Sequence, residues 1–324
     1  MASRRLQMPI APITRLRKQD ILANLRAVDN DPASQQRVIQ LEQGFRARVA
    51  SHVASLTGTT ATLEKYSTSP FVLLIYAHAK RYTKISQIEQ DILPAKLFSS
   101  METSAGRMIE DVVLPIYRWQ SVPSGMHTVN SALDGKQVAL PVLKAVTLKS
   151  GPRCLNDGMS ENLADAVLNH GAAWMTANGA TSLEFTYGVL YGTKRQSNKK
   201  DWHILRNIAE KLPPAAVVAP PWQRWDCSFR LNGVQASATV RVGKDWWDYL
   251  GGPLCLTEVC AALIRACIAP GQADPAGTIY LISDLGIIVA MPPLAQPFAS
   301  VVLQSSQIPW LFFLMKHFCD HLED

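Results

Sequence analysis

The chain has 324 residues, enough for one large domain or two ordinary ones with a sizeable hydrophobic core. Hydrophobic residues make up 48% of it and charged residues 18%, the profile of an ordinary soluble globular protein. No apolar run reaches the roughly 18 residues that a helix needs to cross a bilayer, so membrane insertion is not expected.

The net charge of +6 is concentrated near the N-terminus, where residues 1–50 contribute +5 through nine Lys and Arg residues and four acidic ones. A basic flank suits a polyanionic partner, because neutralised phosphates are the main source of non-specific affinity for nucleic acids. A solvated basic helix face explains the same residues equally well. The six cysteines form no CxxC pair and follow no secretory signal, which favours reduced thiols in the cytoplasm over disulfides or a zinc site.

Helices are predicted first along the chain. Residues 14–55 and 70–92 show helical periodicity with few breakers, and a further helix is expected to begin near Ser100. The apolar face of that helix consists of Ile109, Val112, Val113 and Ile116. We therefore expect an α-helical N-terminal region over residues 1–95, which serves DNA contact or dimerisation.

A mixed region of strands and helices follows. Period-two apolar patterns predict the strands, and helical periodicity predicts the helices, one of them with Leu163, Val167 and Ala173 facing inward. Asn232-Gly233 is a favoured type I′ turn of a hairpin. The strands are expected over 138–149, 182–192 and 278–290, and the helices over 160–176, 201–212, 255–268 and 308–322. Residues 96–324 are thus predicted to form an α/β core in which helices flank a mixed central sheet.

The stretch KAVTLKSGPRCLNDGMSENLADAV, residues 144–167, contains the candidate chemistry. In a strand, Thr147 and Lys149 point to the same side. Asp134 is expected at the mouth of the neighbouring strand, and Glu161 at the start of the next helix, where unpaired amides favour a carboxylate. Each residue also has a plain structural explanation: a surface lysine at a strand end, a turn pair with Gly135, and a first-turn acid.

Two carboxylates and a lysine that converge on one point would form a hydrolytic site. Carboxylate oxygens hold Mg²⁺ and leave room for waters and a phosphate oxygen. The metal polarises a phosphodiester and lowers the pKa of a bound water. The lysine helps to orient or deprotonate that water and offsets the charge of the transition state.

These residues resemble the PD-(D/E)xK active site of type II restriction endonucleases. The likeness rests on Asp134, on Lys149 within Thr-Leu-Lys, and on the Ser-Gly-Pro and Asn156 that follow. Two positions depart from the motif, because Leu133 stands where proline is usual and Thr147 stands where an acid is usual.

The second departure is similar to one branch of the family, which recognises CCGG, CCNGG or CCWGG cores. In that branch the acid lies on the helix after the lysine, and a Ser or Thr takes its place in the strand. The resemblance therefore implies that Glu161 supplies the missing carboxylate and that Thr147 occupies the vacated position.

Two further segments resemble the same family. Glu110, at the end of SSMETSAGRMIE, matches an acid that supports the metal site, and VGKDWWDYLGG (242–252) resembles a segment that follows the nuclease strands. The likeness spans roughly residues 98–252. It implies a Mg²⁺-dependent homodimer that cuts double-stranded DNA at a short palindrome, here one that contains G/C pairs. It also implies a bacterial cytoplasmic enzyme with a cognate DNA methyltransferase.

DNA contacts are expected beyond the catalytic strand. Arg153 could contact guanine through two hydrogen bonds, as an arginine at this distance from the lysine does in the similar branch, or it could clamp a phosphate. Asn156 or Asp157 could address adenine or cytosine. The basic loop GTKRQSNKKDW suits contacts with the DNA backbone, although a solvated loop is the plain alternative. Its basic residues are Lys194, Arg195, Lys199 and Lys200.

Two other functions fit the same residues. A repair or junction-resolving nuclease would keep Asp134, Lys149 and Glu161 but would cut by DNA structure rather than by sequence. A non-catalytic DNA-binding protein would use the basic N-terminal helices, and a Lys149→Ala change would leave its function intact. A serine or cysteine hydrolase is not supported, because no GxSxG or Cys/His signature is present.

Overall fold

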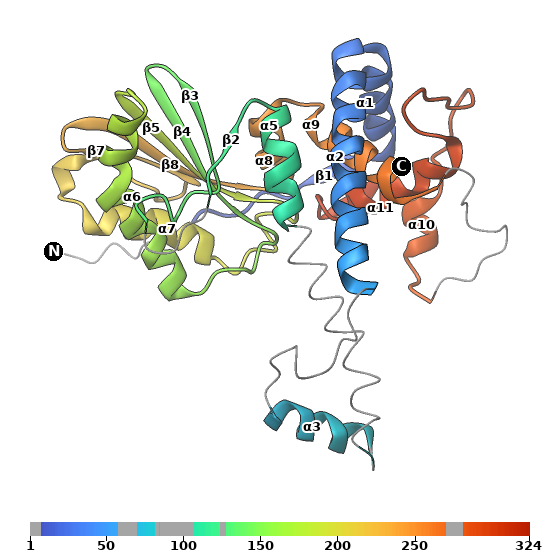
Figure 1. Cartoon of the computed structure of the whole chain (residues 1–324), viewed down its shortest axis with the longest axis horizontal. Coiled ribbons are helices and arrows are strands. Elements are labelled where there is room, and N and C mark those ends of the chain that lie inside the picture. The colour runs from blue at the N-terminus through green and yellow to red at the C-terminus, as the bar shows by residue number, and fades with distance from the viewer. Residues whose placement is uncertain (1–7, 58–69, 82–83, 85–105, 124–127, 270–280) are drawn as a thin grey trace.

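The structure is a computed structural model that describes residues 8–57, 70–81, 84, 106–123, 128–269 and 281–324. Its centre is a seven-stranded mixed sheet with the strand order β2-β3-β4-β5-β8-β7-β6 (Figure 1). The strands β4, β5 and β8 run parallel, whereas each outer strand is antiparallel to its neighbour. The strands are β2 (Gln120–Ser121), β3 (Gly135–Ala139), β4 (Val142–Lys149), β5 (Ser182–Val189), β6 (Val217–Ala219), β7 (Asp226–Leu231) and β8 (Val234–Val242).

Helices cover both faces of this sheet, so the predicted α/β class with a mixed sheet flanked by helices is confirmed. Figure 1 shows α6 and α7 beside the sheet in one half of the molecule and most other helices gathered in the other half. The helical elements are α1 (Lys18–Asn30), α2 (Pro32–Thr57), α3 (Pro70–Lys80), the π-helical turn η2 (Ile109–Val113), α5 (Leu114–Ile116), α6 (Asp157–Ala177), α7 (Lys200–Lys211), the 3-10 turn η3 (Pro214–Ala216), α8 (Lys244–Gly251), α9 (Cys255–Cys267), α10 (Leu285–Val289), the 3-10 turn η4 (Ser305–Gln307) and α11 (Ile308–Lys316).

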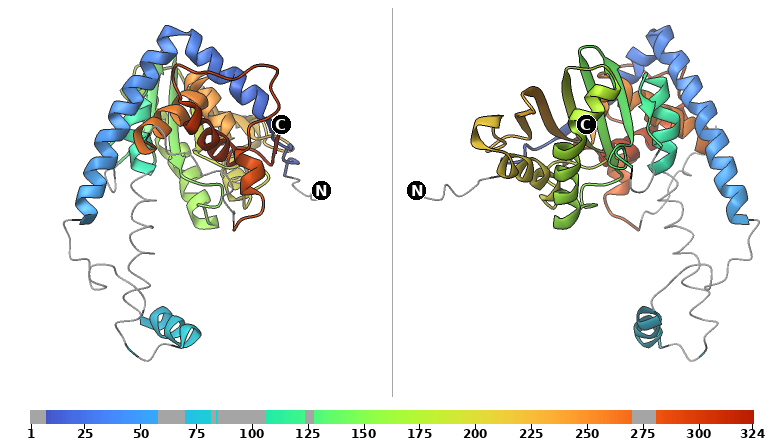
Figure 2. Two further views of the ribbon diagram at one scale, coloured as in Figure 1. Left: turned by 90° about the vertical axis from the view of Figure 1, so that its right-hand side faces the viewer. Right: turned by 60° about the vertical axis from the view of Figure 1, so that its left-hand side comes forward.

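Alternation along β4 divides the buried side chains into two cores, one on each face of the sheet. Leu143 and Ala145 pack with α6 and α7. Val146 and Leu148 pack on the opposite face with Trp246 of α8 and with α1, α2, α9 and α11. The N-terminal helices therefore share a core with the C-terminal ones, and Figure 2 shows α1 and α2 along the outer side of this helical layer.

Several local predictions are confirmed. Asn232 and Gly233 have φ angles of 50° and 83° and form the tight turn between β7 and β8. All six cysteines are free thiols, as expected. The predicted helices over 160–176, 201–212 and 255–268 correspond to α6, α7 and α9.

Four other predictions are wrong in detail. The strand expected over 138–149 is the hairpin β3–β4, because the chain turns at Leu140–Pro141, and proline cannot donate to a strand ladder. The strand expected over 278–290 is wrong within the described residues, where α10 forms instead. The last helix ends at Lys316, not near residue 322. Ala173 of α6 is exposed, since the inward face there continues through Gly171 and Trp174. The helix start expected near Ser100 lies outside the described residues.

A small second sheet pairs a strand from the N-terminal part of the chain with one from the C-terminal part. The strands β1 (Arg15–Arg17) and β9 (His321–Glu323) pair in parallel. The adjoining Lys18 is buried, and its ammonium donates to the carbonyl oxygen of Ile287 at 2.6 Å and to the Asp324 carboxylate at 2.9 Å. The first predicted helix therefore begins at residue 18, after a short strand.

No single helix in the described ranges is long and apolar enough to cross a membrane. Only α8 and α9, bent by 100° at their junction, reach the required length and apolar character together. Trp246, Trp247 and Val259 of this pair are buried in the core.

Candidate active site

The parallel strands β4, β5 and β8 end at the same edge of the sheet, at Lys149, Val189 and Val242. Short connections tie these ends together, since Leu190 N donates to Lys149 O and Gly243 N donates to Val189 O, both at 2.9 Å. The carboxyl ends of parallel strands are the usual place for ligand sites in open α/β sheets. Lys149, the last residue of β4, stands at this edge.

Asp134 lies directly before β3 and is held in place by its backbone and its side chain. Its N–H donates to Val146 O at 2.9 Å, and its carbonyl oxygen accepts from Val122 N at 3.0 Å. Its Oδ2 accepts from the backbone N–H of Leu148 at 2.6 Å. The predicted place of Asp134, at the mouth of the strand beside Lys149, is therefore the place that it has in the structure.

Glu110 belongs to the π-helical turn η2, which precedes the edge strand β2. Two neighbours in this turn, Val112 and Val113, are buried in the core, and the Ser121 hydroxyl donates to the carbonyl oxygen of Glu110 at 3.0 Å. The Glu110 side chain itself is half-buried. Single π-helical turns are rare and often occur at functional sites, because they displace one side chain from the regular helical face.

Glu110, Asp134 and Lys149 lie near enough to one another for their charges to interact, and we refer to them as one cluster. Burial raises the pKa of Glu110 to about 7; the negative charge of Asp134 raises it as well, and the positive charge of Lys149 lowers it. Burial also raises the pKa of Asp134, against the effects of the Leu148 N–H and of Lys149. Two neighbouring carboxylates with raised pKa values form a site that a cation would stabilise.

The number of carboxylates in this cluster limits the kind of metal that it could hold. Within the described ranges, no three His, Cys, Asp or Glu side chains are grouped so that they could hold a metal ion. Mg²⁺ usually keeps several waters and is bound through one or two carboxylates together with substrate phosphates. Glu110 and Asp134 can supply those two carboxylates.

Glu161 is not part of this cluster. It lies on α6 with its side chain 58% exposed, and it forms an ion pair with Lys211 of α7 at 3.1 Å. The charge interactions that shift the pKa values of Glu110 and Asp134 do not include Glu161. The structure therefore separates the expected carboxylate from the lysine, and its catalytic role stays a prediction that the geometry does not favour.

Thr147 stabilises the backbone at this edge of the sheet. It is buried beside Asp134, and its hydroxyl donates to the carbonyl oxygen of Ala132. The hydroxyl thus fixes the segment that presents Asp134. A carboxylate at position 147 could not donate this hydrogen bond without a proton.

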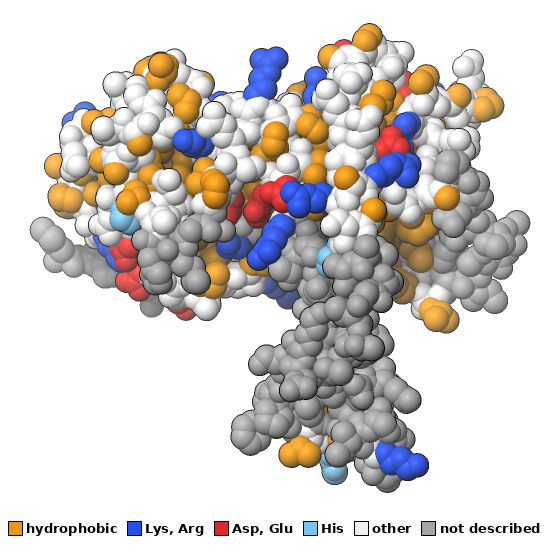
Figure 3. Space-filling model, viewed as in Figure 1, with side chains coloured by type: hydrophobic (Ala, Val, Ile, Leu, Met, Phe, Trp, Pro, Cys, Tyr) orange, Lys and Arg blue, Asp and Glu red, His pale blue; other side chains and the backbone are white. Residues whose placement is uncertain are grey.

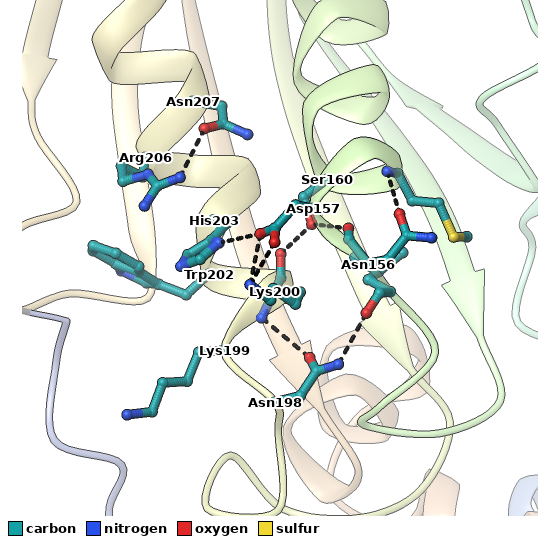
Figure 4. Close-up of polar contacts among 12 residues, drawn as sticks. Asn156, Asp157, Ser160, Asn198, Lys199, Lys200, Trp202, His203, Arg206 and Asn207 are labelled. Carbon is teal, nitrogen blue, oxygen red and sulfur yellow. Dashed lines mark hydrogen bonds and ion pairs between the residues drawn. The ribbon is translucent and has the colours of Figure 1, made fainter.

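The elbow after Lys149 uses two of the three expected base-reading residues for its own structure. The Asn156 side chain caps α6 by accepting from Met159 N at 2.8 Å. The Asp157 carboxylate accepts from the Lys200 ammonium at 2.6 Å and contacts His203 at 3.1 Å (Figure 4). Arg153, in contrast, is exposed, and toward the described residues it donates only its Nε, to the carbonyl oxygen of Gln196 at 3.1 Å.

The four predicted basic loop residues fall into two pairs. Lys194 forms an ion pair with Asp245 at 2.8 Å, and Lys200 is bound to Asp157. Arg195 and Lys199 are exposed, and neither has an ion-pair partner in the described part of the chain. Lys199 has a left-handed backbone, with φ of 72°, at the start of α7, and in Figure 4 its side chain extends away from the paired groups. Of these four loop cations, Arg195 and Lys199 are thus the two that carry no ion pair with the described residues.

Arg107 is a further charged residue near Glu110, and the sequence alone did not single it out. It is exposed, lies three residues before Glu110, and its positive charge lowers the pKa of that carboxyl. The spacing could have indicated this neighbour, because residues three apart lie on the same side of a helix. Figure 3 shows acidic and basic side chains next to one another in the middle of this face, between the sheet and α2.

No known family model matches this chain, and none of the curated proteins matches it.

Proposed function

We propose that this protein is a type II restriction endonuclease, which hydrolyses phosphodiester bonds of double-stranded DNA with Mg²⁺. The observation that carries the proposal is the cluster of Glu110, Asp134 and Lys149 at the carboxyl edge of the parallel strands. Two carboxylates and a lysine in this relation are the groups that metal-assisted phosphodiester hydrolysis requires.

Each residue has a distinct role in this reaction. Asp134 and Glu110 would hold the metal through their carboxylate oxygens, and Glu110 would give up its proton on binding it, since burial and the charge of Asp134 favour its neutral form. A metal held there would supply polarisation of the phosphodiester and a bound water of lowered pKa. The Lys149 ammonium offsets the charge that develops on the phosphate oxygens and orients the attacking water.

The partners follow from the same proposal. A palindromic site on duplex DNA presents two scissile bonds related by a two-fold axis, so one active site per strand requires two copies of the chain. A restriction enzyme also requires a cognate DNA methyltransferase to protect the DNA of its bacterial host. The homodimer, the methyltransferase and the cytoplasmic location are parts of the proposal.

The test is a gel of phage or plasmid DNA incubated with the full-length protein and Mg²⁺. The wild type should give discrete bands, and Lys149→Ala should give none while it still retards DNA in a binding gel. Lys144→Ala is the matched control, because Lys144 belongs to the same strand but packs its ammonium over the Tyr249 ring, 5.4 Å from the ring centre. This control should keep the wild-type bands.

Other outcomes separate the competing functions. A Lys149-dependent smear would favour a repair or junction nuclease on the same core over a restriction enzyme. DNA that stays intact with Mg²⁺, while it is bound equally by the wild type and Lys149→Ala, would overturn the catalytic proposal and favour a DNA-binding protein.

A further inference from the structure

A pocket lies between the elbow after β4 and the loop after β5, a few residues beyond Lys149. Its volume is about 420 Å³, and Gly151, Pro152, Arg153, Cys154, Tyr191 and Gln196 line it. The pocket is open at the edge of the sheet where the proposed site stands. What it could bind depends on which of its groups are fixed and which remain free.

The elbow and the loop are interlocked. A Cβ atom on Gly151 would lie 2.7 Å from the Tyr191 hydroxyl oxygen, and one on Gly192, which has φ of +92°, would lie 2.7 Å from Pro152. Asn198, labelled in Figure 4, donates its side-chain amide to Leu155 O at 2.9 Å. Glycines at both contacts allow the two segments to approach this closely, so the pocket is rigid before any ligand arrives.

The C-terminal segment anchors the same loop from its other side. Gly192 N donates to His317 O at 2.9 Å, and the Thr193 hydroxyl donates to Asp320 Oδ1 at 2.8 Å. The loop that carries Tyr191 and Gln196 is thus fixed by the elbow and by the end of the chain.

Two side chains of the pocket, Arg153 and Gln196, offer free hydrogen-bond donors, and the Tyr191 hydroxyl can donate or accept. The Nε of Arg153 is bound to Gln196 O, which holds the guanidinium plane and leaves its two terminal nitrogens without a partner in the described residues. The Oε1 of Gln196 accepts from Thr193 N at 3.1 Å, so the side-chain NH₂ of Gln196 is directed elsewhere and has no partner there either. Tyr191, 47% exposed, supplies an aromatic wall.

This set of donors selects among the base edges of the major groove. Guanine presents two acceptors, N7 and O6, and thymine presents one, O4, whereas adenine presents an acceptor beside an amino donor, and cytosine presents an amino donor. Among these base edges, guanine offers the most acceptors to the Arg153 and Gln196 donors. An amino group placed against these two side chains would find no acceptor on them, which costs affinity.

We propose that Arg153 and Gln196 together read guanine in the major groove at this pocket, and that Tyr191 forms its apolar wall. This inference rests on the proposed function and deepens it, since it names Gln196 and Tyr191 as specificity residues beside Arg153. Arg153 contacts one guanine through its two terminal nitrogens, and Gln196 donates to an acceptor of the same or the adjacent guanine.

The test is selection from a random duplex library by the full-length Lys149→Ala protein, which should bind DNA without cutting it. The parent should select a sequence that contains guanine, and adding Gln196→Ala should reduce the preference for guanine at one position by roughly tenfold. Replacing that guanine with 7-deazaguanine should weaken binding by the parent, whereas it should have little further effect on the Gln196→Ala protein if the lost contact is to N7.

A second variant, Gln196→Glu, distinguishes the loss of a base contact from the loss of the folded structure. Gln196→Glu keeps an oxygen that can accept from Thr193 N and places a second acceptor in the pocket. It should shift the selected base at that position from guanine to cytosine or adenine, which offer amino donors. The control Lys199→Ala, at an exposed cation without an ion-pair partner among the described residues, should weaken binding to all sequences equally.

Three results would overturn the inference. Unchanged guanine selection in both Gln196 variants would show that the pocket does not read the base. Equal weakening for every sequence would indicate a phosphate contact instead. Lys149-dependent cleavage without any selected guanine would leave the nuclease in place but remove this specificity. The absence of Lys149-dependent cleavage, measured separately, would count against the proposed function itself.

Discussion

Two clusters of charged residues lie at the same end of the sheet, and they differ in how their charges are satisfied. Along α6 and α7, Asp157 is paired with Lys200 and His203, and Glu161 is paired with Lys211. Hydrogen bonds from Lys200 and His203 lower the pKa of Asp157. At the end of β4, by contrast, burial raises the pKa values of both Glu110 and Asp134.

The difference separates a cluster of paired charges from the candidate site. Paired charges on neighbouring helices stay largely solvated, so they lose little solvation and contribute little to stability. Carboxylates held together without a full set of partners destabilise the fold, and such an arrangement is typical of a site that awaits a cation or a substrate. Glu110 and Asp134 are therefore better candidates for metal binding than Glu161, although sequence likeness favoured Glu161.

The largest expected effect comes from Asp134→Asn. This change keeps the size of the side chain and an oxygen that can accept from Leu148 N, but it removes the charge from the proposed metal site. We expect cleavage to fall by at least roughly 10²–10³-fold, as when one stabilising group of a transition state is removed. Mg²⁺ should also no longer raise the melting temperature of the variant, since binding to the folded state is lost. An active variant that Mg²⁺ still stabilises would contradict the assignment.

A smaller effect is expected from Glu110→Gln, measured as a difference in melting temperature from the wild type in the absence of metal. The Glu110 pKa is about 7 in the folded protein against an ordinary 4.5. Between these pH values the unfolded chain releases a proton that the folded chain retains, so this group favours the fold fully below pH 4.5 and loses that contribution as the pH rises through 7. The variant should therefore gain melting temperature over the wild type at pH 8 and not at pH 4 in EDTA.

The matched control for that comparison is Glu161→Gln. It removes an exposed acid, which is ion-paired with Lys211 at 3.1 Å and does not affect the pKa of Glu110, and should bring no gain at pH 8. A Glu110→Gln protein that is less stable than the wild type at both pH values would show that Glu110 supports the fold rather than a site.

The smallest effect is expected within the paired cluster. Asp157→Asn removes the charge that Lys200 and His203 contact, but the carboxylate is exposed, and exposed ion pairs contribute little. The melting temperature should change by no more than about 2 °C, and cleavage should stay within about twofold of the wild type. A loss of cleavage comparable to that of Asp134→Asn would show that the two clusters act as one site.

The sequence predicted the elements around the site because their patterns are local. The alternation of β4 placed Thr147 and Lys149 on one side, and helical periodicity located α6 and α7 to within a few residues. Asp134 could be placed beside the end of β4 because an apolar run precedes it and because it forms a turn pair with Gly135. The strand expected over 278–290 failed because a short apolar run does not distinguish a strand from a helix.

The carboxylate partner of Asp134 could not be chosen from the sequence, for a geometric reason. The helix that carries Glu161 begins at Asp157, three residues before its predicted start, and each residue of an α-helix turns the side-chain direction by about 100°. The direction of Glu161 was therefore undetermined. Glu110 lies in a π-helical turn. The hydrophobic pattern of the sequence does not reveal the altered register of such a turn, so the direction of the Glu110 side chain could not be predicted.

The most direct measurement compares Mg²⁺-dependent DNA cleavage by Glu110→Gln and Glu161→Gln under identical conditions. Both changes convert a glutamate into its isosteric amide, and only the first alters the cluster with Asp134 and Lys149. We predict that Glu110→Gln loses cleavage by roughly 10²-fold or more, whereas Glu161→Gln stays within about twofold of the wild type. Loss of cleavage in Glu161→Gln with full activity in Glu110→Gln would contradict the account. It would indicate that Glu161 of α6, and not Glu110, is the catalytic carboxylate.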